Sequence, residues 1–117
     1  MGTDLGERGE AHAAEFLRRQ GYEIIARNYR WRGGEIDLIA RDRNWLVFVE
    51  VKARSGDDYG LPEEAITAAK RRRLITAARA YLAGGRVERD WDIRFDVVAI
   101  SGGEIRLHQG VFQLELE

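Results

Sequence analysis

Two acidic residues and a lysine fall on neighbouring segments that alternate like β-strands. The segment from Gly33 to Arg54 reads GGEIDLIARDRNWLVFVEVKAR, with Asp37 on the first predicted strand and Glu50 and Lys52 on the second. Because successive side chains of a strand point to opposite faces, Glu50 and Lys52 project from the same side. Two such carboxylates can hold a divalent metal ion, and a lysine beside them can orient an attacking water.

A turn at Arg43 and Asn44 sets the register of this predicted hairpin. Counting outward from the turn, antiparallel pairing places Asp37 directly across from Glu50. Directly opposed residues have Cβ atoms roughly 4.5–5.5 Å apart, so the two carboxylates would be like charges in near contact. A divalent cation would resolve this conflict, since magnesium takes oxygen ligands from carboxylates, an exposed backbone carbonyl and several waters.

The same alternation predicts which residues share a face. On the first strand Asp37 lies on the side of Ile39, while Ile36, Leu38 and Ala40 take the opposite side. The apolar neighbours indicate that the acidic face is partly buried, where unpaired carboxylates cost several kcal/mol. The alternative is that both acids are solvated charges on an exposed sheet face. The combination of two acids and a lysine favours the functional interpretation.

The composition predicts one globular domain spanning residues 1–117, with 44% hydrophobic and 33% charged residues. The absence of cysteine excludes disulfides and thiolate metal sites. No early apolar run resembles a signal peptide or a membrane span, so we expect a cytoplasmic location and no membrane partner. The formal charge of −1 gives no overall attraction for polyanions, and nucleic-acid binding would depend on local basic surfaces.

Arginine is the usual cation of this chain, because only Lys52 and Lys70 are lysines among 19 basic residues. A compact ammonium approaches a single oxygen, whereas guanidinium favours bidentate contacts, so lysine at these positions suggests a chemical requirement. Chance remains the alternative. Lys70 is expected on or beside the apolar stripe of its helix, either reaching the acidic site or only covering apolar surface. Candidate nucleic-acid-binding residues are Lys70, Arg71, Arg72, Arg73 and Arg54, for which an ordinary solvated surface is the alternative.

Two helices are predicted to flank the strands. The first extends from about Asp4 to Gln20, with Gly21 in the left-handed position after its last turn and Glu10 at the edge of its apolar face. The second begins near Pro62, which is suited to a first helical turn, and ends at Gly84 after Leu82. Glu10 could therefore lean over the sheet.

The strands predict an α/β fold with the order αβββαβ. A strand from Tyr22 to Arg30 precedes the hairpin, and a strand from Asp92 to Ile100 follows the second helix. A right-handed crossover makes that strand parallel to the second hairpin strand. Residues 104–107 are expected to form an edge strand. Asp96 interrupts the apolar pattern of its strand, and we favour an exposed position for it over a buried functional acid.

Four motifs together resemble the YraN-like family of small uncharacterised bacterial proteins, over nearly the whole chain. They are GEIDLIA at residues 34–40, VFVEVKAR at residues 47–54, Gly9-Glu10, and RFDV at residues 94–97. That family is similar to the PD-(D/E)XK nuclease superfamily and, within it, to archaeal Holliday-junction resolvases. The resemblance implies a restriction-endonuclease-like αβββαβ core with a mixed central sheet flanked by two helices.

The resemblance also implies a set of catalytic residues, Asp37, Glu50, Lys52 and Glu10. Asp37 and Glu50 would bind magnesium or manganese together with the backbone carbonyl of Val51, and Glu10 would complete the coordination through water. Lys52 would position the attacking water. Ile36 stands where the motif has proline, which departs from the pattern.

The function implied by the resemblance is a metal-dependent endonuclease that hydrolyses DNA phosphodiester bonds, with branched DNA or repair intermediates as candidate substrates. Resolvase-like relatives imply a homodimer, and a further protein partner stays open. Two alternatives remain. One is a non-catalytic nucleic-acid-binding or DNA-processing accessory module, and the other is a structural interaction domain in which the acidic and basic residues have no common role.

Overall fold

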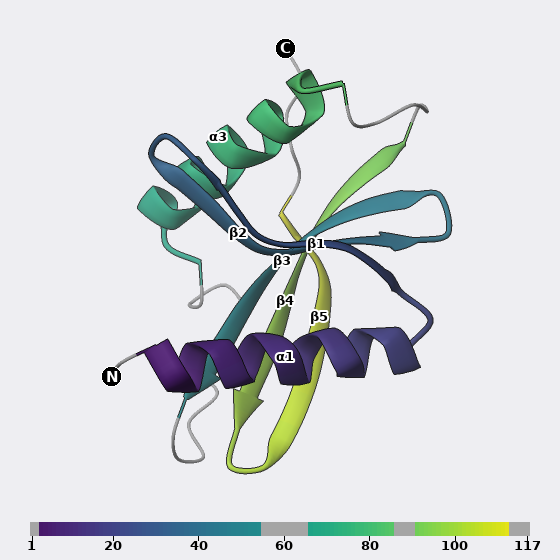
Figure 1. Ribbon diagram of the computed structural model, residues 1–117, viewed down its shortest axis with the longest axis vertical. Coiled ribbons are helices and arrows are strands. Elements are labelled where there is room, and N and C mark those ends of the chain that lie inside the picture. Colours follow the sequence, from purple (N-terminus) through teal and green to yellow (C-terminus); the bar gives the residue numbers. More distant parts are fainter. Residues whose placement is uncertain (1–2, 55–65, 86–90, 113–117) are drawn as a thin grey trace.

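The computed structural model describes residues 3–54, 66–85 and 91–112. It confirms the predicted αβββαβ order and the predicted edge strand that follows it (Figure 1). The described elements are α1 (Thr3–Arg19), β1 (Glu23–Trp31), β2 (Gly34–Asp42), β3 (Trp45–Arg54), α3 (Ala68–Ala83), β4 (Asp92–Ser101) and β5 (Glu104–Phe112). In this part of the chain no helix is both long and apolar enough to cross a membrane.

The strands form a mixed sheet in the order β1-β2-β3-β4-β5. Only β3 and β4 pair in parallel, with Trp45 beside Asp92, while the other neighbouring strands are antiparallel. This confirms the predicted parallel strand after the second helix, because a parallel pair requires a crossover connection. The edge strand β5 is longer than predicted and continues past residue 107 to Phe112.

The two faces of the sheet carry separate apolar cores. Figure 1 shows α1 and α3 on different sides of the strongly twisted strands. Residues of α1 pack with one face and residues of α3 with the other, as the alternation of the strands requires. The α1 core contains Ala13, Ala14, Leu17, Tyr22, Leu38, Ala40, Val47, Val49 and Val98. The α3 core contains Ile36, Ile39, Leu46, Phe48, Ile66, Leu74, Ala77, Ala78, Tyr81, Phe95, Val97 and Phe112.

The second helix begins later than its sequence predicts. Thr67 is its N-cap, with an extended backbone (φ −70°, ψ 165°) and a hydroxyl that accepts the Lys70 N–H. Threonine is a favoured capping residue because its oxygen satisfies an otherwise unpaired donor of the first turn. The expected start at Pro62 lies outside the described residues, but a helix continuous from there is excluded by the extended Thr67. The end at Gly84 is as predicted.

The alternation of β2 is interrupted at Asp37, which contradicts the expectation that Ile36 shares a face with Leu38. Ile36 packs in the α3 core, whereas Leu38 packs in the α1 core. On the neighbouring strand β1, Asn28 has a φ of +52°, which is uncommon outside glycine. This conformation lies at the same level of the sheet and reverses the faces of the strands locally. Asp37 lies just beyond the last β2–β3 pair, Leu38 and Val49, while β1 and β2 stay paired as far as Gly34.

Gly34 allows the beginning of β2 to lie directly against α3. A Cβ atom at this position would collide with the carbonyl oxygen of Arg73 and contact Ala77. Glycine is thus required for the close approach of strand and helix. The approach places the following residues of β2, including Asp37, next to the first turns of α3.

Candidate functional site

A pocket of about 120 Å³ lies between β2, β3 and the first turns of α3. Its lining residues come from three separate parts of the sequence, and all but one of them are charged. They are Glu35, Asp37, Glu50, Lys70, Arg73 and Leu74. The tight contact at Gly34 and the cap at Thr67 hold the helix end over the strands at this point.

Asp37 is anchored to the neighbouring strand through its carboxylate. The predicted hairpin register is correct, because residues 43 and 44 form the turn and Leu38 pairs with Val49. Beyond this pair, Asp37 Oδ2 accepts a hydrogen bond from the Val51 N–H at 2.8 Å. The side chain thus satisfies a strand N–H in place of a backbone carbonyl. The N–H and C=O of one strand residue point toward the same neighbour, so the Val51 carbonyl also faces β2.

Asp37 and Glu50 lie in direct contact, as the register predicts, and share a hydrogen bond between their carboxyl groups. Burial raises the pKa of Asp37, although the Val51 N–H opposes this effect. Burial and the nearby charge of Asp37 raise the pKa of Glu50 to about 8. Two acids that cannot both ionise easily titrate as a pair and retain a proton near neutral pH.

Lys70 reaches this acidic pair, which answers the question that the sequence left open. Its Nζ lies 3.0 Å from Glu50 Oε1, and the Glu50 side chain is only 9% exposed. Lys70 comes from the first turn of α3, where the Thr67 cap fixes the backbone. The ammonium lowers the cost of a buried Glu50 carboxylate, but one positive charge does not balance two acids.

Two predicted catalytic residues do not line the pocket. Lys52 is half-buried on β3, and within the described part of the chain no ion pair involves it. Glu10 belongs to α1, whose Gly9 packs closely against Ala53 and Val51 on the other side of the sheet. The roles of Lys52 and Glu10 in catalysis stay predictions.

The donor set suits a metal ion that keeps much of its water. Among the described residues no group of three or more acidic or histidine side chains is arranged to hold a metal. Asp37 and Glu50 nevertheless offer two carboxylates, and the Val51 carbonyl faces the same strand. Magnesium commonly binds through one or two carboxylates and retains several waters, whereas a closed protein cage is typical of other metals. The pocket residues therefore fit magnesium or manganese.

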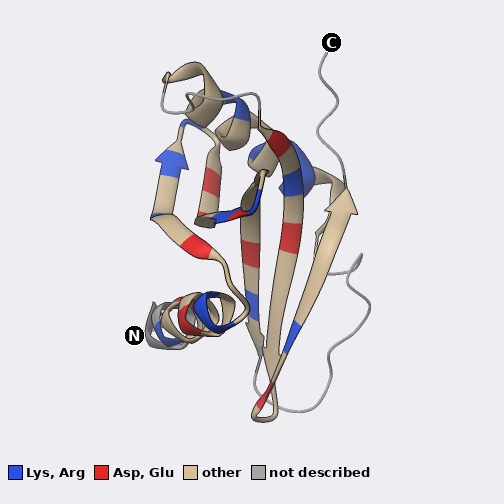
Figure 2. Ribbon diagram, turned by 90° about the vertical axis from the view of Figure 1, so that its right-hand side faces the viewer, with Lys and Arg blue, Asp and Glu red and all other residues tan. Residues whose placement is uncertain are grey.

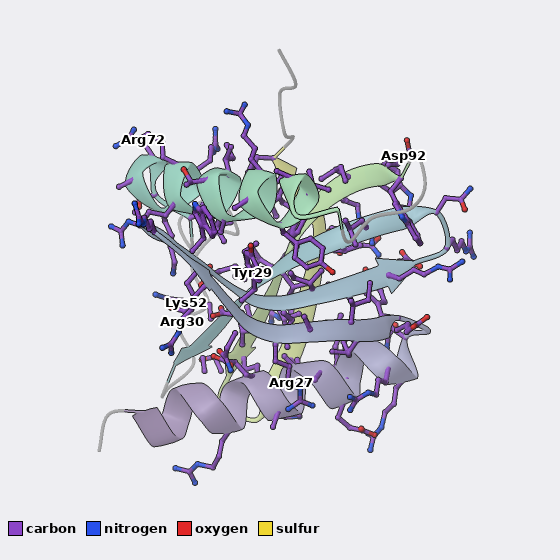
Figure 3. All side chains as sticks on the ribbon, turned by 45° about the horizontal axis from the view of Figure 1, so that its top comes forward. Arg27, Tyr29, Arg30, Lys52, Arg72 and Asp92 are labelled. Atoms are coloured by element: carbon purple, nitrogen blue, oxygen red, sulfur yellow. The ribbon has the colours of Figure 1, made fainter. Side chains whose placement is uncertain are left out.

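The basic residues of α3 lie near acidic residues of the sheet, as Figure 2 shows by the blue segments on the helix and the red segments on the strands. Arg73 lines the pocket beside Lys70, one helical turn further along. Arg71 lies over the ring of Phe112, with its guanidinium carbon 5.0 Å from the ring centroid. Arg72 is exposed and points away from the sheet (Figure 3). The Arg54 side chain lies outside the described part, and nucleic-acid binding by this group stays a prediction.

A second charged cluster lies at another part of the sheet, on the α1 side, and the sequence did not predict it. Asp96 is only 1% exposed, so the expectation of an exposed position was wrong. Its carboxylate accepts hydrogen bonds from Arg94 Nε at 2.9 Å, the Tyr22 hydroxyl at 2.8 Å and the Gly110 N–H at 3.0 Å. Arg94 also pairs with Asp42 at 2.8 Å.

This second cluster also joins two acids, Asp42 and Asp96, to one cation, but Arg94 is hydrogen-bonded to both of them. Tyr22 accepts hydrogen bonds from Arg94 and from Gln109, and Arg94 stands over the Trp45 ring. Among the described buried side chains, no polar atom lacks a partner. Burial raises the pKa of Tyr22 to about 12. A polar hollow of about 360 Å³ borders the cluster. The alternating positions of residues 94 and 96, with opposite charges on one strand face, were the signal that could have revealed it.

Comparison with known proteins identifies a family model and several relatives that this chain matches. Residues 9–100 match the model of the uncharacterised protein family UPF0102. The chain is 57% identical over 103 residues to the UPF0102 protein STH1475 of Symbiobacterium thermophilum, covering 88% of this chain and 86% of the relative. It is 50% identical over 103 residues to a UPF0102 protein of Lachnoclostridium phytofermentans, covering 88% and 87%. A UPF0102 protein of Dechloromonas aromatica is 46% identical over 113 residues, covering 97% and 92%.

Proposed function

The chain belongs to the uncharacterised protein family UPF0102, as its resemblance to the YraN-like family predicted, and we propose that it is a metal-dependent nuclease acting on DNA. The observation that carries the proposal is the buried contact between Asp37 and Glu50, in a pocket that Lys70 and Arg73 also line. Holding two carboxylates together at a buried position is costly unless a bound cation compensates their charge. The PD-(D/E)XK superfamily is the proposed wider relationship.

The residues of the pocket have separable roles in this proposal. A magnesium or manganese ion bound by Asp37 and Glu50 would activate a water and neutralise charge on the phosphate. The Val51 N–H fixes one oxygen of Asp37, which orients the carboxylate. Arg73 lines the same pocket and can bind a phosphate oxygen through its guanidinium. Lys52 is proposed to orient the attacking water.

DNA is the proposed substrate because the cations continue beyond the pocket. Arg71 and Arg72 extend the basic surface of α3, and Arg30 and Arg32 lie exposed on the β1–β2 hairpin that packs against this helix. Phosphate contacts of this kind position a nucleic acid without reading its bases. Substrate preference would then depend on the shape of the DNA, and branched molecules and repair intermediates are the first to test.

The experiment that tests this proposal is a cleavage assay with purified protein and magnesium or manganese. Linear duplex, single-stranded, flapped and four-way DNA would be compared for the wild type, Asp37→Asn and Glu50→Gln. Asp92→Asn is a matched control, because Asp92 is an exposed carboxylate at the start of β4 (Figure 3). We expect cleavage that requires metal and is lost in both pocket variants but not in the control. Absence of cleavage by the wild type, or equal cleavage by all variants, rejects the proposal.

A second candidate function is a nucleic-acid-binding accessory module without its own catalysis. The observation that favours it is the ion pair between Lys70 and Glu50, which already supplies one cation to the acidic pair. Salt-dependent DNA binding that persists in Asp37→Asn, with no cleavage under either metal, would support this function over the first.

A further inference from the structure

Lys70 contacts the acidic pair from a helix position that does not favour a cation. It lies in the first turn of α3, which contains no acidic residue, and three arginines follow it. The positive end of the helix dipole makes anions favourable there and cations unfavourable. Helix stability therefore does not explain lysine at this position, whereas its 3.0 Å contact with Glu50 does.

Within the described part of the chain, the contact leaves Asp37 and Glu50 with a single ion-paired cation, which touches only Glu50. Asp37 and Glu50 are two acids, and Lys70 is the one cation that an ion pair joins to them among the described residues. In the second cluster one cation also pairs with two acids, but Arg94 contacts both of them and its side chain is only 12% exposed. The Lys70 side chain is 35% exposed and has a flexible stem, so its ammonium can leave Glu50 without unfolding the helix.

A divalent ion and the ammonium compete for the same carboxylate. The Glu50 oxygen that faces Lys70 would be next to a metal held by Asp37 and Glu50, where two positive charges repel each other. Lys70 and Arg73 line the pocket together, one turn apart on α3. An ammonium displaced from Glu50 thus stays beside Arg73, where a phosphate with two basic neighbours would fit.

We propose that Lys70 is the internal cation of the acidic pair, that a divalent metal must displace it from Glu50, and that a DNA phosphate receives the displaced ammonium. This inference rests on the proposed function, because it assigns Lys70 the regulation of the same site. Lys70 acts through Glu50 and is a positioning residue. Metal and phosphodiester binding are then positively coupled, since each makes the other more favourable by the same factor.

Manganese affinity, measured by electron paramagnetic resonance without DNA, tests the first half of the proposal. Lys70→Gln removes the competing charge and is expected to bind Mn²⁺ about tenfold more tightly than the wild type. Lys70→Arg keeps the charge with a bidentate group and is expected to bind more weakly. Arg27→Gln is the control, because Arg27 is an exposed cation of β1 that does not line the pocket, and is expected to change little. A gain in Mn²⁺ affinity for one substitution and a loss for the other at the same position cannot both result from misfolding. Thermal melting checks that each variant is folded.

The second half is tested by repeating the titration with a short phosphorothioate oligonucleotide, which resists hydrolysis, after correction for metal bound by the oligonucleotide alone. The wild type is expected to gain about fivefold or more in Mn²⁺ affinity, and Lys70→Gln to gain less. The proposal is overturned if Lys70→Gln binds no more tightly than the wild type, if Arg27→Gln shows the same change, or if no protein binds Mn²⁺. Lysine-dependent Mn²⁺ binding without DNA cleavage would reject the nuclease and retain this inference, and cleavage without the Lys70 effect would do the reverse.

Discussion

The two charged clusters of this molecule lie on opposite faces of the same sheet and differ in how their charges are satisfied. Around Asp96, the carboxylate accepts hydrogen bonds from a guanidinium, a hydroxyl and a backbone N–H. Around Glu50, a second acid stands in contact, one lysine provides the counter-charge, and the pKa is raised to about 8. Both acids are buried, so burial alone does not distinguish a structural from a functional charge.

The number of hydrogen-bond donors around each buried acid is what separates the clusters. A saturated network holds its members in one arrangement and has little remaining affinity for a ligand. A pair of acids with too few partners stores unfavourable energy that a cation would release. Local departures from stability rules are expected at functional sites, and the pocket of Asp37 and Glu50 is such a departure.

The largest expected effect comes from Arg94→Met, which leaves Asp96 and Asp42 without their shared cation. Removing one partner of a buried ion pair typically costs about 3–5 kcal/mol, because the remaining charge is uncompensated. Urea denaturation would measure the loss of unfolding free energy. Arg27→Met is the control, since Arg27 is an exposed residue of β1, and is expected to have a small effect. Equal stability of the two variants would remove the distinction between the clusters.

Gly34→Ala should disturb the pocket between β2, β3 and α3 and leave the cluster around Asp96 intact. The added methyl collides with the Arg73 carbonyl, so strand and helix must separate, at a cost of about 2–3 kcal/mol. Denaturation gives the cost, and the Lys70 distance to Glu50 in a crystal structure of the variant shows whether the pocket opens. A variant as stable as the wild type would show that the contact is easily relieved.

Glu50→Gln should stabilise the protein in the absence of metal, in the opposite direction to Arg94→Met. Glutamine removes a charge that is unfavourable in the folded state, and we expect a gain of about 2 kcal/mol at pH 8. Because the folded pKa of Glu50 is raised from 4.5 to about 8, the wild type is relatively stable below pH 4.5 and loses stability as the pH rises through 8.

The gain from Glu50→Gln should therefore shrink as the pH falls toward 4.5. Melting temperatures of the wild type and the variant across this range check the sign. A gain that does not depend on pH, or a loss at pH 8, would mean that the Glu50 carboxyl is not strained by its surroundings.

Tyr22→Phe should give the smallest effect, a loss of about 1–1.5 kcal/mol, because it removes hydrogen bonds but leaves the Arg94 and Asp96 pair intact. Urea denaturation at neutral pH would measure it. The hydroxyl stays protonated through this range, since burial raises the pKa of Tyr22 to about 12. A loss as large as that of Arg94→Met would show that the hydroxyl, rather than the ion pair, holds the cluster together.

The sequence predicts the features that depend on local patterns. Alternation and a two-residue turn gave the hairpin register, so Asp37 and Glu50 were paired correctly. The helix and strand order followed from the same patterns. The position of Lys70 on its helix was predicted, but whether it contacts Glu50 depends on how α3 packs, through the close approach at Gly34.

Features that depend on distant residues were missed. Asp96 bonds to Tyr22 across a separation of 74 residues, and the local pattern of opposite charges at residues 94 and 96 does not identify that partner. The interruption of alternation at Asp37 likewise depends on the backbone of Asn28 on another strand. In each case the deciding contact belongs to the assembled sheet and not to the segment that contains the residue.

The parallel pairing of β3 and β4 connects the two clusters. Val49 lies beside Asp96 and Glu50 lies beside Val97, so the two acids occupy consecutive levels of one strand pair and face opposite ways. A shift of one residue would turn each acid into the wrong core. The hydrogen-bonded cluster around Asp96 thus helps to fix the register of β3 and β4. Its contribution to the stability of the fold offsets the unfavourable energy of the pocket. Substitutions at positions 37, 50 and 70 can alter the chemistry of the pocket over evolutionary time while the strand pairing and the cluster around Asp96 stay the same.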